Sequence, residues 1–222
     1  LHFTDSVLDA VAGHEMYSFL DVFSSYNQVR MHPDDQEKTA FVTKWGVFVA
    51  VVMMFGLKTA PATFQRIISE VFEEYNPAFM QVFLDDFAVY GMRKDHLHHL
   101  RLCLERCRAA RLSLNPAKCA FGVTSGTLLG HIVSKEGIAV DPRKIEAIIK
   151  SPAPKNAKQL GWFLGQLCWH NRMLLHLADF ATPLHATVHR TPFQWTETEE
   201  EAYGALKVML SQAPVVQPPD WA

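Results

Sequence analysis

The stretch Phe79-Met80-Gln81-Val82-Phe83-Leu84-Asp85-Asp86-Phe87-Ala88-Val89-Tyr90 consists of two short apolar runs separated by two acidic residues. Such a pattern predicts a β-hairpin with strands at 79–84 and 87–90. Turns of this length usually contain glycine, because the positive φ angles that they need are easiest for a residue without a side chain. Turn chemistry therefore explains Asp85 and Asp86 poorly, whereas a divalent cation that neutralises both carboxylates would explain them.

A third carboxylate, Asp21, directly follows another short apolar run, Tyr17 to Leu20, which is predicted to be a strand. If the strands are neighbours, the three carboxylates could hold a pair of Mg²⁺ ions. Two such ions stabilise the attacking and leaving oxygens of a phosphoryl displacement. Strand ends that are acidic without any function would give the same pattern, so the residues alone leave both interpretations open.

The rest of the chain alternates between short strands and helices in an irregular order. Further strands are predicted at 26–31, 128–133 and 138–140, with turns at His32-Pro33-Asp34-Asp35 and Lys135-Glu136-Gly137. Helices are predicted from Pro61 to Asn76-Pro77, after Asp95, and after the capping signals Asp141-Pro142, Asn156, and Thr196 with Glu199. Strands and helices without regular βαβ alternation favour an α+β fold. A domain boundary is expected near residue 140.

The helix after Asp95 is expected to bury an apolar stripe made of Leu97, Leu100, Leu104 and Cys107. His99, Cys103 and Cys107 recur at i, i+4 and i+8 on the same helix, but the C-x₂-C spacing of zinc sites is missing, which disfavours zinc. The glycines at 122, 126 and 130 lack the Gly-Lys-Ser/Thr signature, which excludes a P-loop.

Composition and charge limit the kinds of protein to which the chain can belong. The 222 residues are 49% hydrophobic and 20% charged, which is typical of a globular protein with one or two domains. The longest apolar run, 45–57, is shorter than the roughly 20 residues that span a bilayer, so no membrane partner is expected. Four cysteines are too few for a disulfide framework and indicate a reducing compartment. Because the chain lacks an initiator Met, we expect that it is cut from a larger protein.

The charges are unevenly distributed along the chain. Residues 1–90 carry 5 Lys/Arg and 12 Asp/Glu, whereas residues 91–160 carry 13 and 5. An acidic block followed by a basic block would suit a metal site beside a surface that binds a polyanion. Two ordinary solvated surfaces are the alternative.

Several segments resemble, in order, the palm motifs of reverse transcriptases, and most of all those of Ty3/gypsy-type LTR retrotransposon polyproteins. The palm segments are Asp21 to Gln28, Glu37 to Phe41, Phe55 to Arg66 and Phe83 to Asp86. The similarity continues through Leu112 to Cys119, Leu129 to Ser134, Gly137 to Asp141, Pro154 to Asn156 and Phe163 to Gly165, and ends in Phe193-Gln194-Trp195, which resembles the start of the family's RNase H domain.

The resemblance implies an α+β polymerase palm with an antiparallel sheet, followed by a mainly helical thumb and connection. It implies three segments: 1–138 as palm with the fingers largely missing, 139–190 as thumb and connection helices, and 191–222 as the truncated start of an RNase H-like domain. The implied function is RNA-directed DNA polymerase, a nucleotidyltransferase within a retrotransposon polyprotein. A catalytically inactive remnant that only binds nucleic acid is the alternative, and a two-metal phosphohydrolase is a third.

The resemblance also assigns roles to individual residues. Asp21, Asp85 and Asp86 would be the catalytic, metal-binding triad for two Mg²⁺ ions, with Mn²⁺ as a substitute. The implied nucleotide-binding residues are Phe23, Ser24, Ser25, Tyr26, Phe55 and Gly56. Tyr26 would lie beneath the incoming sugar and collide with a ribose 2′-hydroxyl, and the backbone N–H groups of 23–25 would face the triphosphate. The implied template and primer contacts are Pro61, Gln65, Leu129, Gly130 and His131.

The implied partners are an RNA template, a DNA primer or duplex, deoxynucleoside triphosphates, and the RNase H and integrase parts of the polyprotein. The implied location is a cytoplasmic retroelement particle, or the nucleus during DNA integration. The chain departs from the family pattern at three positions: Met54 replaces proline, Ser25 replaces glycine, and Phe83 replaces tyrosine. None of these changes removes a metal ligand. We expect the family's upstream finger segment and its RNase H carboxylates to lie outside residues 1–222.

Overall fold

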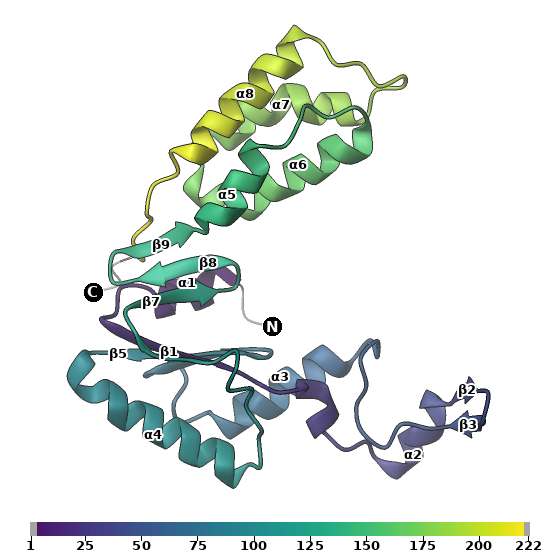
Figure 1. The fold of residues 1–222 in the computed structure, drawn as a ribbon, viewed down its shortest axis with the longest axis vertical. Coiled ribbons are helices and arrows are strands. Elements are labelled where there is room, and N and C mark those ends of the chain that lie inside the picture. The colour runs from purple at the N-terminus through teal and green to yellow at the C-terminus, as the bar shows by residue number, and fades with distance from the viewer. Residues whose placement is uncertain (1–3, 220–222) are drawn as a thin grey trace. The chain divides into compact units, whose positions relative to one another are not determined.

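The structure is a computed structural model that describes residues 4–219 (Figure 1). The chain divides into two compact units. Of the described residues, 4–129, 133–135 and 218–219 form the first unit, and 130–132 and 136–217 form the second. No helix within residues 4–219 is both long and apolar enough to cross a membrane.

A four-stranded antiparallel sheet forms the centre of the first unit. Its strand order is β4-β5-β1-β6. The strands are β4 (Met80–Phe83), β5 (Asp86–Gly91), β1 (Met16–Asp21) and β6 (Ala120–Val123). The strand predicted at 17–20 is therefore confirmed, and it lies in the interior of the sheet between β5 and β6.

The predicted hairpin is present, but its turn lies one residue earlier than predicted. Phe83 pairs with Asp86, so the turn residues are Leu84 and Asp85, and Asp86 is the first residue of β5. Leu84 has a φ of 54°, which is uncommon for a residue with a side chain. Its backbone N–H donates to the side chain of Gln65 at 2.7 Å. This tertiary contact, which hydropathy cannot predict, helps to set the position of the turn.

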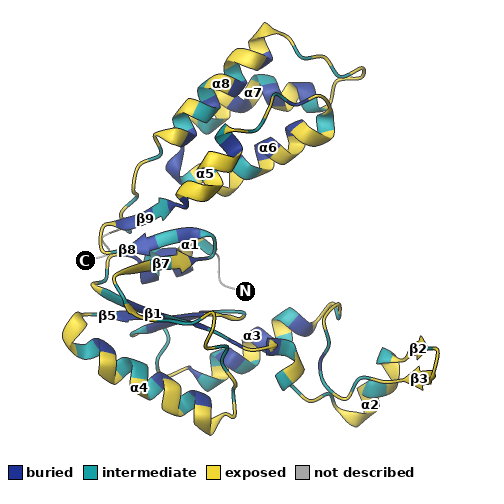
Figure 2. Ribbon diagram, viewed as in Figure 1, coloured by how far each residue is buried: buried dark blue, intermediate teal, exposed yellow. Residues whose placement is uncertain are grey.

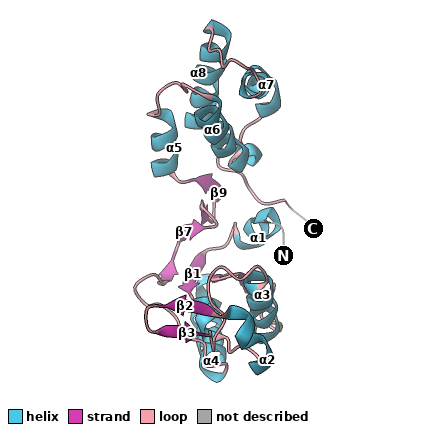
Figure 3. Cartoon of the chain, turned by 90° about the vertical axis from the view of Figure 1, so that its right-hand side faces the viewer, coloured by secondary structure: helices cyan, strands magenta, loops and turns pink. Residues whose placement is uncertain are grey.

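Three helices pack on this sheet. α3 (Ala60–Val71) and α4 (Arg93–Ala109) lie on one face and α1 (Thr4–Val11) lies on the other (Figures 1 and 3). α3 contains Pro61 in its first turn as predicted, and it ends at Val71, earlier than the predicted stop at Asn76-Pro77. The core between the sheet and the two helices includes Leu20, Val82, Phe87, Phe64, Ile68, Cys103 and Cys107.

The buried face of α4 differs from the predicted apolar stripe. Of the four predicted residues, Cys107 is buried and Leu100 packs against the core, but Leu97 is 71% exposed and Leu104 is also exposed. His96 and Cys103, which were not predicted, are buried. A buried hydrogen bond between Ser18 Oγ and His96 Nε2 (2.8 Å) anchors this face on β1, a contact that counting leucines does not predict. Burial raises the pKa of Cys103 to about 12 and the pKa of Cys107 to about 11, so both thiols are protonated core side chains.

The segment between β1 and α3 was predicted wrongly. The 3₁₀ helix η1 (Ser25–Gln28) replaces most of the strand predicted at 26–31, because Ser24 adopts a left-handed conformation that turns the chain away from β1. α2 (Pro33–Gln36) and the 3₁₀ helix η2 (Glu37–Thr39) follow, where the sequence predicted only a turn. β2 (Phe41–Thr43) and β3 (Gly46–Phe48) then form a hairpin whose apolar side chains are largely exposed (Figure 2).

Three consecutive strands form a second antiparallel sheet element. β7 (Ser125–Leu128), β8 (His131–Ser134) and β9 (Gly137–Val140) have the order β7-β8-β9. The segment predicted as one strand at 128–133 is split into two. Leu129 and Gly130 have φ angles of 48° and 77°, which make a tight turn between β7 and β8.

Four helices make up most of the second unit: α5 (Pro142–Ile149), α6 (Ala157–Trp169), α7 (Leu177–Val188) and α8 (Glu197–Ser211), with the 3₁₀ helix η3 (Asn171–Met173) after α6. The caps predicted for α5, α6 and α8 are confirmed, whereas Asp95, which was predicted to cap the helix after β5, lies inside the first turn of α4, whose N-cap is Met92. Asp141 accepts a hydrogen bond from the N–H of Arg143, Asn156 accepts one from the N–H of Gln159, and Thr196 with Glu199 forms the capping box.

The chain divides into two compact units, and the predicted assignment of palm, thumb and RNase H-like segments stays a prediction. The apolar face of α8, which includes Tyr203, Leu206 and Leu210, shares one core with Leu160 and Phe163 of α6. The described part of 191–222 is therefore not a separate body, because this face is buried against α5 to α7. The change of unit falls between 129 and 136, close to the predicted boundary at 138. Antiparallel sheets combined with helices in irregular order confirm the predicted α+β class.

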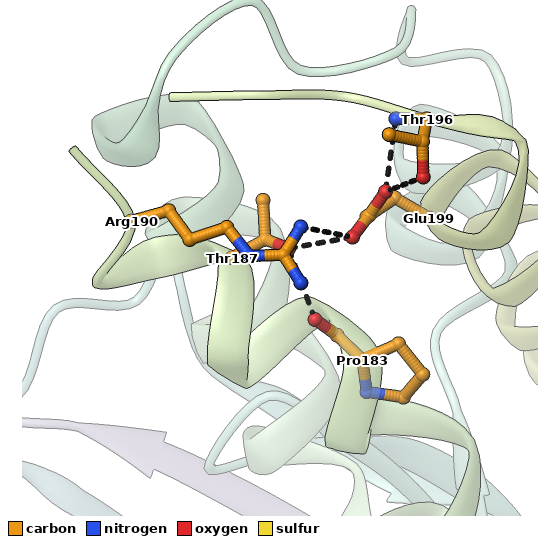
Figure 4. A network of polar contacts seen from close by, with 5 residues as sticks. All are labelled: Pro183, Thr187, Arg190, Thr196 and Glu199. Carbon is orange, nitrogen blue, oxygen red and sulfur yellow. Dashed lines mark hydrogen bonds and ion pairs between the residues drawn. The ribbon is translucent and has the colours of Figure 1, made fainter. Parts of the chain in front are cut away.

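A buried polar network joins α7 to α8 (Figure 4). Glu199 is only 2% exposed, and its carboxylate accepts hydrogen bonds from Thr187 Oγ1 (2.8 Å) and the N–H of Thr196 (2.9 Å). Arg190 lies 3.1 Å from the same carboxylate. Hydrogen bonds from Thr196 and Thr187 lower the pKa of Glu199 to about 2, so the carboxylate remains ionised in this buried position.

Glu199→Gln is expected to destabilise the second unit by about 1 to 2 kcal/mol near neutral pH, because charge-assisted hydrogen bonds are lost. The folded-state pKa of about 2 lies below the ordinary value of 4.5. The stabilisation is therefore complete above pH 4.5 and is lost as the pH falls towards 2. Thermal unfolding across this range measures the difference. Glu201→Gln, an exposed neighbour on α8, is the control, and a difference that does not shrink in acid would contradict the assignment.

Candidate active site

The sheet brings the three predicted carboxylates to one end of neighbouring strands. Asp21 is the last residue of β1 and Asp86 is the first residue of β5, and the two lie directly opposite each other in the antiparallel pair. Asp85 occupies the adjacent turn, where its carbonyl oxygen accepts a hydrogen bond from the N–H of Val22 at 3.3 Å. Asp21 and Asp86, which are 65 positions apart in the sequence, therefore lie side by side at one end of the sheet.

Negative charge is poorly compensated at this strand end. Like charges directly opposite each other on antiparallel strands are destabilising. The carboxylate of Asp21 is 3.4 Å from the ammonium group of Lys118. Asp86 is an exposed residue, but partial desolvation of its carboxyl group, followed by the negative charges of Asp85 and Asp21, raises its pKa, and Lys118 opposes this rise.

The chemistry of this donor set suits a divalent cation, since three carboxylates provide hard oxygen ligands whose mutual repulsion a cation would relieve. In this structure, the carboxylates of Asp21, Asp85 and Asp86 are not arranged around a common metal position. Within residues 4–219, no group of three or more His, Cys, Asp or Glu side chains is positioned to hold a metal ion. Metal binding at Asp21, Asp85 and Asp86 would therefore require side-chain rotation at the strand end.

Backbone contacts hold Asp21 in place. Its N–H donates to Cys119 Sγ at 3.4 Å, and its carbonyl oxygen accepts a hydrogen bond from the N–H of Asn115 at 2.8 Å. The loop that carries Lys118 is thus fixed beside β1 by its own backbone.

Gln65, which is predicted to contact template or primer, makes hydrogen bonds within the protein. It is 7% exposed and lies on α3 beneath the hairpin. Its side-chain oxygen accepts the N–H of Leu84 at 2.7 Å, and its side-chain nitrogen donates to the carbonyl oxygen of Val82 at 3.3 Å. In this structure, Gln65 therefore positions the turn that carries Asp85.

Gln65→Met is expected to destabilise the first unit by about 1 to 3 kcal/mol, because the N–H of Leu84 loses its partner. Thermal unfolding measures the loss, and amide hydrogen exchange at Leu84 should become faster. Ser69→Ala is a matched control, since Ser69 Oγ receives only a second hydrogen bond from the Gln65 amide. If Gln65→Met leaves stability and exchange unchanged but weakens template binding, the sequence-based role is the correct one.

Tyr26, one of the predicted nucleotide-binding residues, packs against two aromatic rings and is acted on by the charge of Asp85. The ring of Tyr26 lies 5.0 Å from that of Phe55 and 5.6 Å from that of Phe64, measured between centroids. Desolvation and the negative charge of Asp85 raise the pKa of Tyr26, which places its hydroxyl within electrostatic reach of the turn. Phe55 is 64% exposed, and Gly56 has a φ of 96°. Tyr26 and Phe55 therefore form an aromatic wall beside Asp85.

The loop 23–25 is tighter than the sequence suggests. Ser24 carries the left-handed φ of 46°, and Ser25 is buried. The N–H of Phe23 donates to the carbonyl oxygen of Ser113 at 3.0 Å, so this N–H is already used. Of the three N–H groups predicted to face a triphosphate, the structure engages that of Phe23 within the protein.

The other residues that are predicted to contact template or primer lie in separate parts of the chain. Pro61 is half-buried in the first turn of α3. Leu129 and Gly130 form the left-handed turn before β8. The His131 side chain is buried within the second unit, where its ring stacks on Trp169 at 6.1 Å.

The comparison with protein families decides the class of the chain. Residues 2–133, more than half of the chain, match the family model described as "Reverse transcriptase (RNA-dependent DNA polymerase)". The chain belongs to the reverse transcriptase family. The resemblance that the palm motifs indicate is confirmed.

Relatives of this reverse transcriptase domain are Ty3/gypsy-type transposon polyproteins. The chain is 31% identical to the Retrovirus-related Pol polyprotein from transposon 297 of Drosophila melanogaster, over 98% of the chain and 21% of the relative. It is 27% identical to the Transposon Tf2-3 polyprotein of Schizosaccharomyces pombe, over 96% of the chain and 16% of the relative. The chain thus spans about a fifth or less of the length of these curated relatives.

Solved structures share the fold of this reverse transcriptase domain. A foamy viral protease-reverse transcriptase in complex with RNA/DNA hybrid matches with a TM-score of 0.89 and 19% identity, over 99% of this chain and 30% of that chain. A dRH form in complex with ds DNA matches with a TM-score of 0.92 and 18% identity, over 99% and 39%. At these identities the likeness establishes the fold alone, and the fold agrees with the predicted palm followed by helices.

Three residues of this reverse transcriptase domain take part in the site but were not predicted to. Lys118 pairs with Asp21, and Cys119 accepts the N–H of Asp21. Gln28 accepts the N–H of Ser113 at 2.7 Å and so ties the end of η1 to the same loop. The matched segments 21–28 and 112–119 contain all three, but a single sequence carries no signal that these segments touch.

Proposed function

We propose that the chain is the palm and thumb part of an RNA-directed DNA polymerase that adds deoxynucleotides to a DNA primer. The observation that carries the proposal is the register of β1 and β5, which places Asp21 opposite Asp86 with Asp85 in the next turn. Three carboxylates near one strand end, which a single lysine compensates only in part, suit the binding of divalent cations in a member of the reverse transcriptase family, and this family generally uses them.

In the proposed mechanism, Asp21, Asp85 and Asp86 would hold two Mg²⁺ ions, for which Mn²⁺ could substitute. When bound, such ions lower the pKa of a primer 3′-hydroxyl and stabilise the charge on the triphosphate. The chain's own residues position the substrates. Tyr26 and Phe55 form the wall beneath the sugar and base, and the loop 23–25 lies next to the triphosphate. Lys118, whose ammonium group lies 3.4 Å from the carboxylate of Asp21, would neutralise that carboxylate in the absence of a cation.

The proposed partners follow from the same site and from the relatives. They are an RNA or DNA template, a DNA primer, deoxynucleoside triphosphates, and the RNase H and integrase parts of a polyprotein. Pro61, Gln65, Leu129, Gly130 and His131 are proposed contacts for template and primer. The proposed location is a cytoplasmic retroelement particle, with nuclear entry during DNA integration.

Primer extension tests the proposed function. The protein, at the full length that its gene encodes, is incubated with Mg²⁺ or Mn²⁺, deoxynucleotides and a labelled DNA primer on an RNA template. A polymerase lengthens the primer in a template-dependent manner. A phosphohydrolase would shorten the primer, and an inactive remnant would leave it unchanged, so either outcome would overturn the proposal.

A further inference from the structure

Helix α4 carries an exposed groove that the proposed polymerase site does not use. The groove has a volume of about 310 Å³, and all of its lining residues belong to this one helix: Leu97, Leu100, Arg101, Leu104, Glu105 and Arg108. Leu97 is 71% exposed and Leu104 is 38% exposed, and the exposed residues of the helix can be followed in Figure 2. Apolar side chains are therefore in contact with water along one side of α4.

The lining residues of this groove form two rows along the helix. One row consists of residues 97, 101 and 105, and the other of residues 100, 104 and 108, so neighbours within a row are four positions apart. Side chains with this spacing form the ridges of an α-helix, and the groove between two ridges receives a ridge of another helix. The shape of the groove therefore suits a helical partner.

The charged residues of the groove are not paired within the chain. In the part of the chain that the structure describes, Arg101, Glu105 and Arg108 form no ion pair. Arg106, which does not line the groove, pairs with Glu74. The groove thus presents two cations and one carboxylate that are available to a second molecule.

This mixture of charges favours a second copy of the same helix as the partner. A two-fold axis that passes the helix at the level of Cys103 would make the two copies of α4 antiparallel. Arg101 lies two positions before this level and Glu105 two positions after it, and both belong to the same row. Each Arg101 would therefore face Glu105 of the second copy, and the symmetry would produce this contact twice.

The apolar residues of the groove fit the same arrangement. Leu104 is one position away from the level of the axis, so the two Leu104 side chains would meet near the centre of the contact. Leu97 lies six positions before the axis and Arg108 five positions after it. Leu97 would therefore pack on the aliphatic part of Arg108 of the second copy. Antiparallel pairing thus covers the exposed leucines and pairs the charges at the same time.

An acidic helix or a polyanion fits the groove less well. Either could pair with Arg101 and Arg108, but either would also bring negative charge against Glu105, which lies between them in the sequence. A polyanion would in addition leave Leu97 and Leu104 in water. The charge pattern of the groove is complementary to itself and favours self-association.

We propose that α4 is an interface between two copies of this chain, in which two α4 helices pack antiparallel with Arg101 of each copy against Glu105 of the other. The proposal goes beyond the proposed polymerase function, since none of the groove residues belongs to the candidate active site. One helix from each copy gives a small interface, so we expect a weak dimer whose population rises with protein concentration.

Sedimentation equilibrium of the 222-residue chain without nucleic acid measures this dimer. Arg101→Glu and Glu105→Arg each place like charges opposite each other in a homodimer. Each variant alone is expected to dimerise at least about tenfold more weakly than the parent, because attraction becomes repulsion at two symmetric contacts. Arg66→Glu, which reverses an exposed charge on the neighbouring helix α3, is the matched control and should dimerise as the parent does.

Mixing the two variants tests the pairing itself. In a dimer of one Arg101→Glu chain and one Glu105→Arg chain, both contacts again join opposite charges, so the mixture should dimerise about as tightly as the parent. A chain that carries both substitutions should also recover dimerisation by itself. An effect of either substitution on folding could not produce this recovery.

Three results would overturn the proposal. The first is a parent chain that remains monomeric up to about 1 mM. The second is self-association that either single variant leaves unchanged, which would place the contact on another surface. The third is a mixture of the two variants that dimerises no better than each variant alone. None of these results bears on the proposed polymerase function, whose test is primer extension.

Discussion

Asp85→Asn is expected to reduce primer extension by at least about a hundredfold, because the loss of one carboxylate weakens the binding of divalent cations that stabilise the transition state. Asp85 is exposed in the turn between β4 and β5, so the substitution leaves the core intact. Extension rates at saturating Mg²⁺ measure the effect. Asp34→Asn, which removes an exposed carboxylate of α2, is the matched control and should extend primers at the parent rate.

The neighbouring carboxylate, Asp86, gives a pH-dependent prediction for the same site. Because the pKa of Asp86 is raised in the folded protein, its ionisation costs folding free energy that is absent below its ordinary pKa of 3.8 and present above the raised value. Without metal, Asp86→Asn should therefore unfold at a higher temperature than the parent near neutral pH, and the difference should vanish in acid. Excess Mg²⁺ should remove this advantage, since only the parent has all three carboxylates.

Two results would rule out the proposed site. One is near-parental extension by Asp85→Asn. The other is an Asp86→Asn protein whose stability relative to the parent is the same with EDTA as with Mg²⁺. Thermal unfolding in both conditions also shows whether any loss of activity arises from loss of the fold.

Local sequence patterns predicted the secondary structure correctly where a short segment determines its own conformation. Asp141, Asn156 and Thr196 cap helices as predicted, because an N-cap depends on one side chain and the next few N–H groups. The short apolar run at 17–20 likewise predicted β1, and the two-run pattern predicted the β4-β5 hairpin.

Tertiary contacts account for the predictions that failed. The hairpin turn is displaced by one residue, and Gln65, 19 positions before Leu84, accepts the N–H of that turn residue. α4 buries His96 in place of Leu97, since Ser18 offers His96 a buried hydrogen bond. In each case a polar contact between distant segments prevails over the local apolar pattern, and one sequence gives no signal for such contacts.

The candidate site, too, could be predicted from the sequence only in part. Both acidic strand ends could be found from the sequence, because carboxylates beside apolar runs are conspicuous. Their direct pairing could not, since it depends on the register of β1 against β5, and a shift by one residue would move Asp86 to the other face of the sheet. The resemblance to reverse transcriptases implies that these carboxylates share one site, whereas the apolar pattern alone does not.

Tyr26→Val is expected to relax sugar selection while leaving the carboxylates in place. In the structure the ring of Tyr26 packs against Phe55 and Phe64, and the charge of Asp85 acts on its hydroxyl. A ring held in this way cannot move aside for an additional hydroxyl group. Steric overlap in a packed pocket typically costs on the order of a few kcal/mol. The preference for a deoxynucleotide over its ribonucleotide should therefore fall by about ten- to a hundredfold.

The measurement is the ratio of kcat/KM for the two nucleotides in the parent, in Tyr26→Val and in Tyr26→Phe. The phenylalanine variant keeps the ring and loses only the hydroxyl, so it should select sugars as the parent does if exclusion is steric. Relaxed selection in Tyr26→Phe would instead assign discrimination to the hydroxyl beside Asp85. If Tyr26→Val extends primers with an unchanged ratio, Tyr26 serves only to pack Phe55 against α3, and the nucleotide pocket lies on another side of the carboxylates.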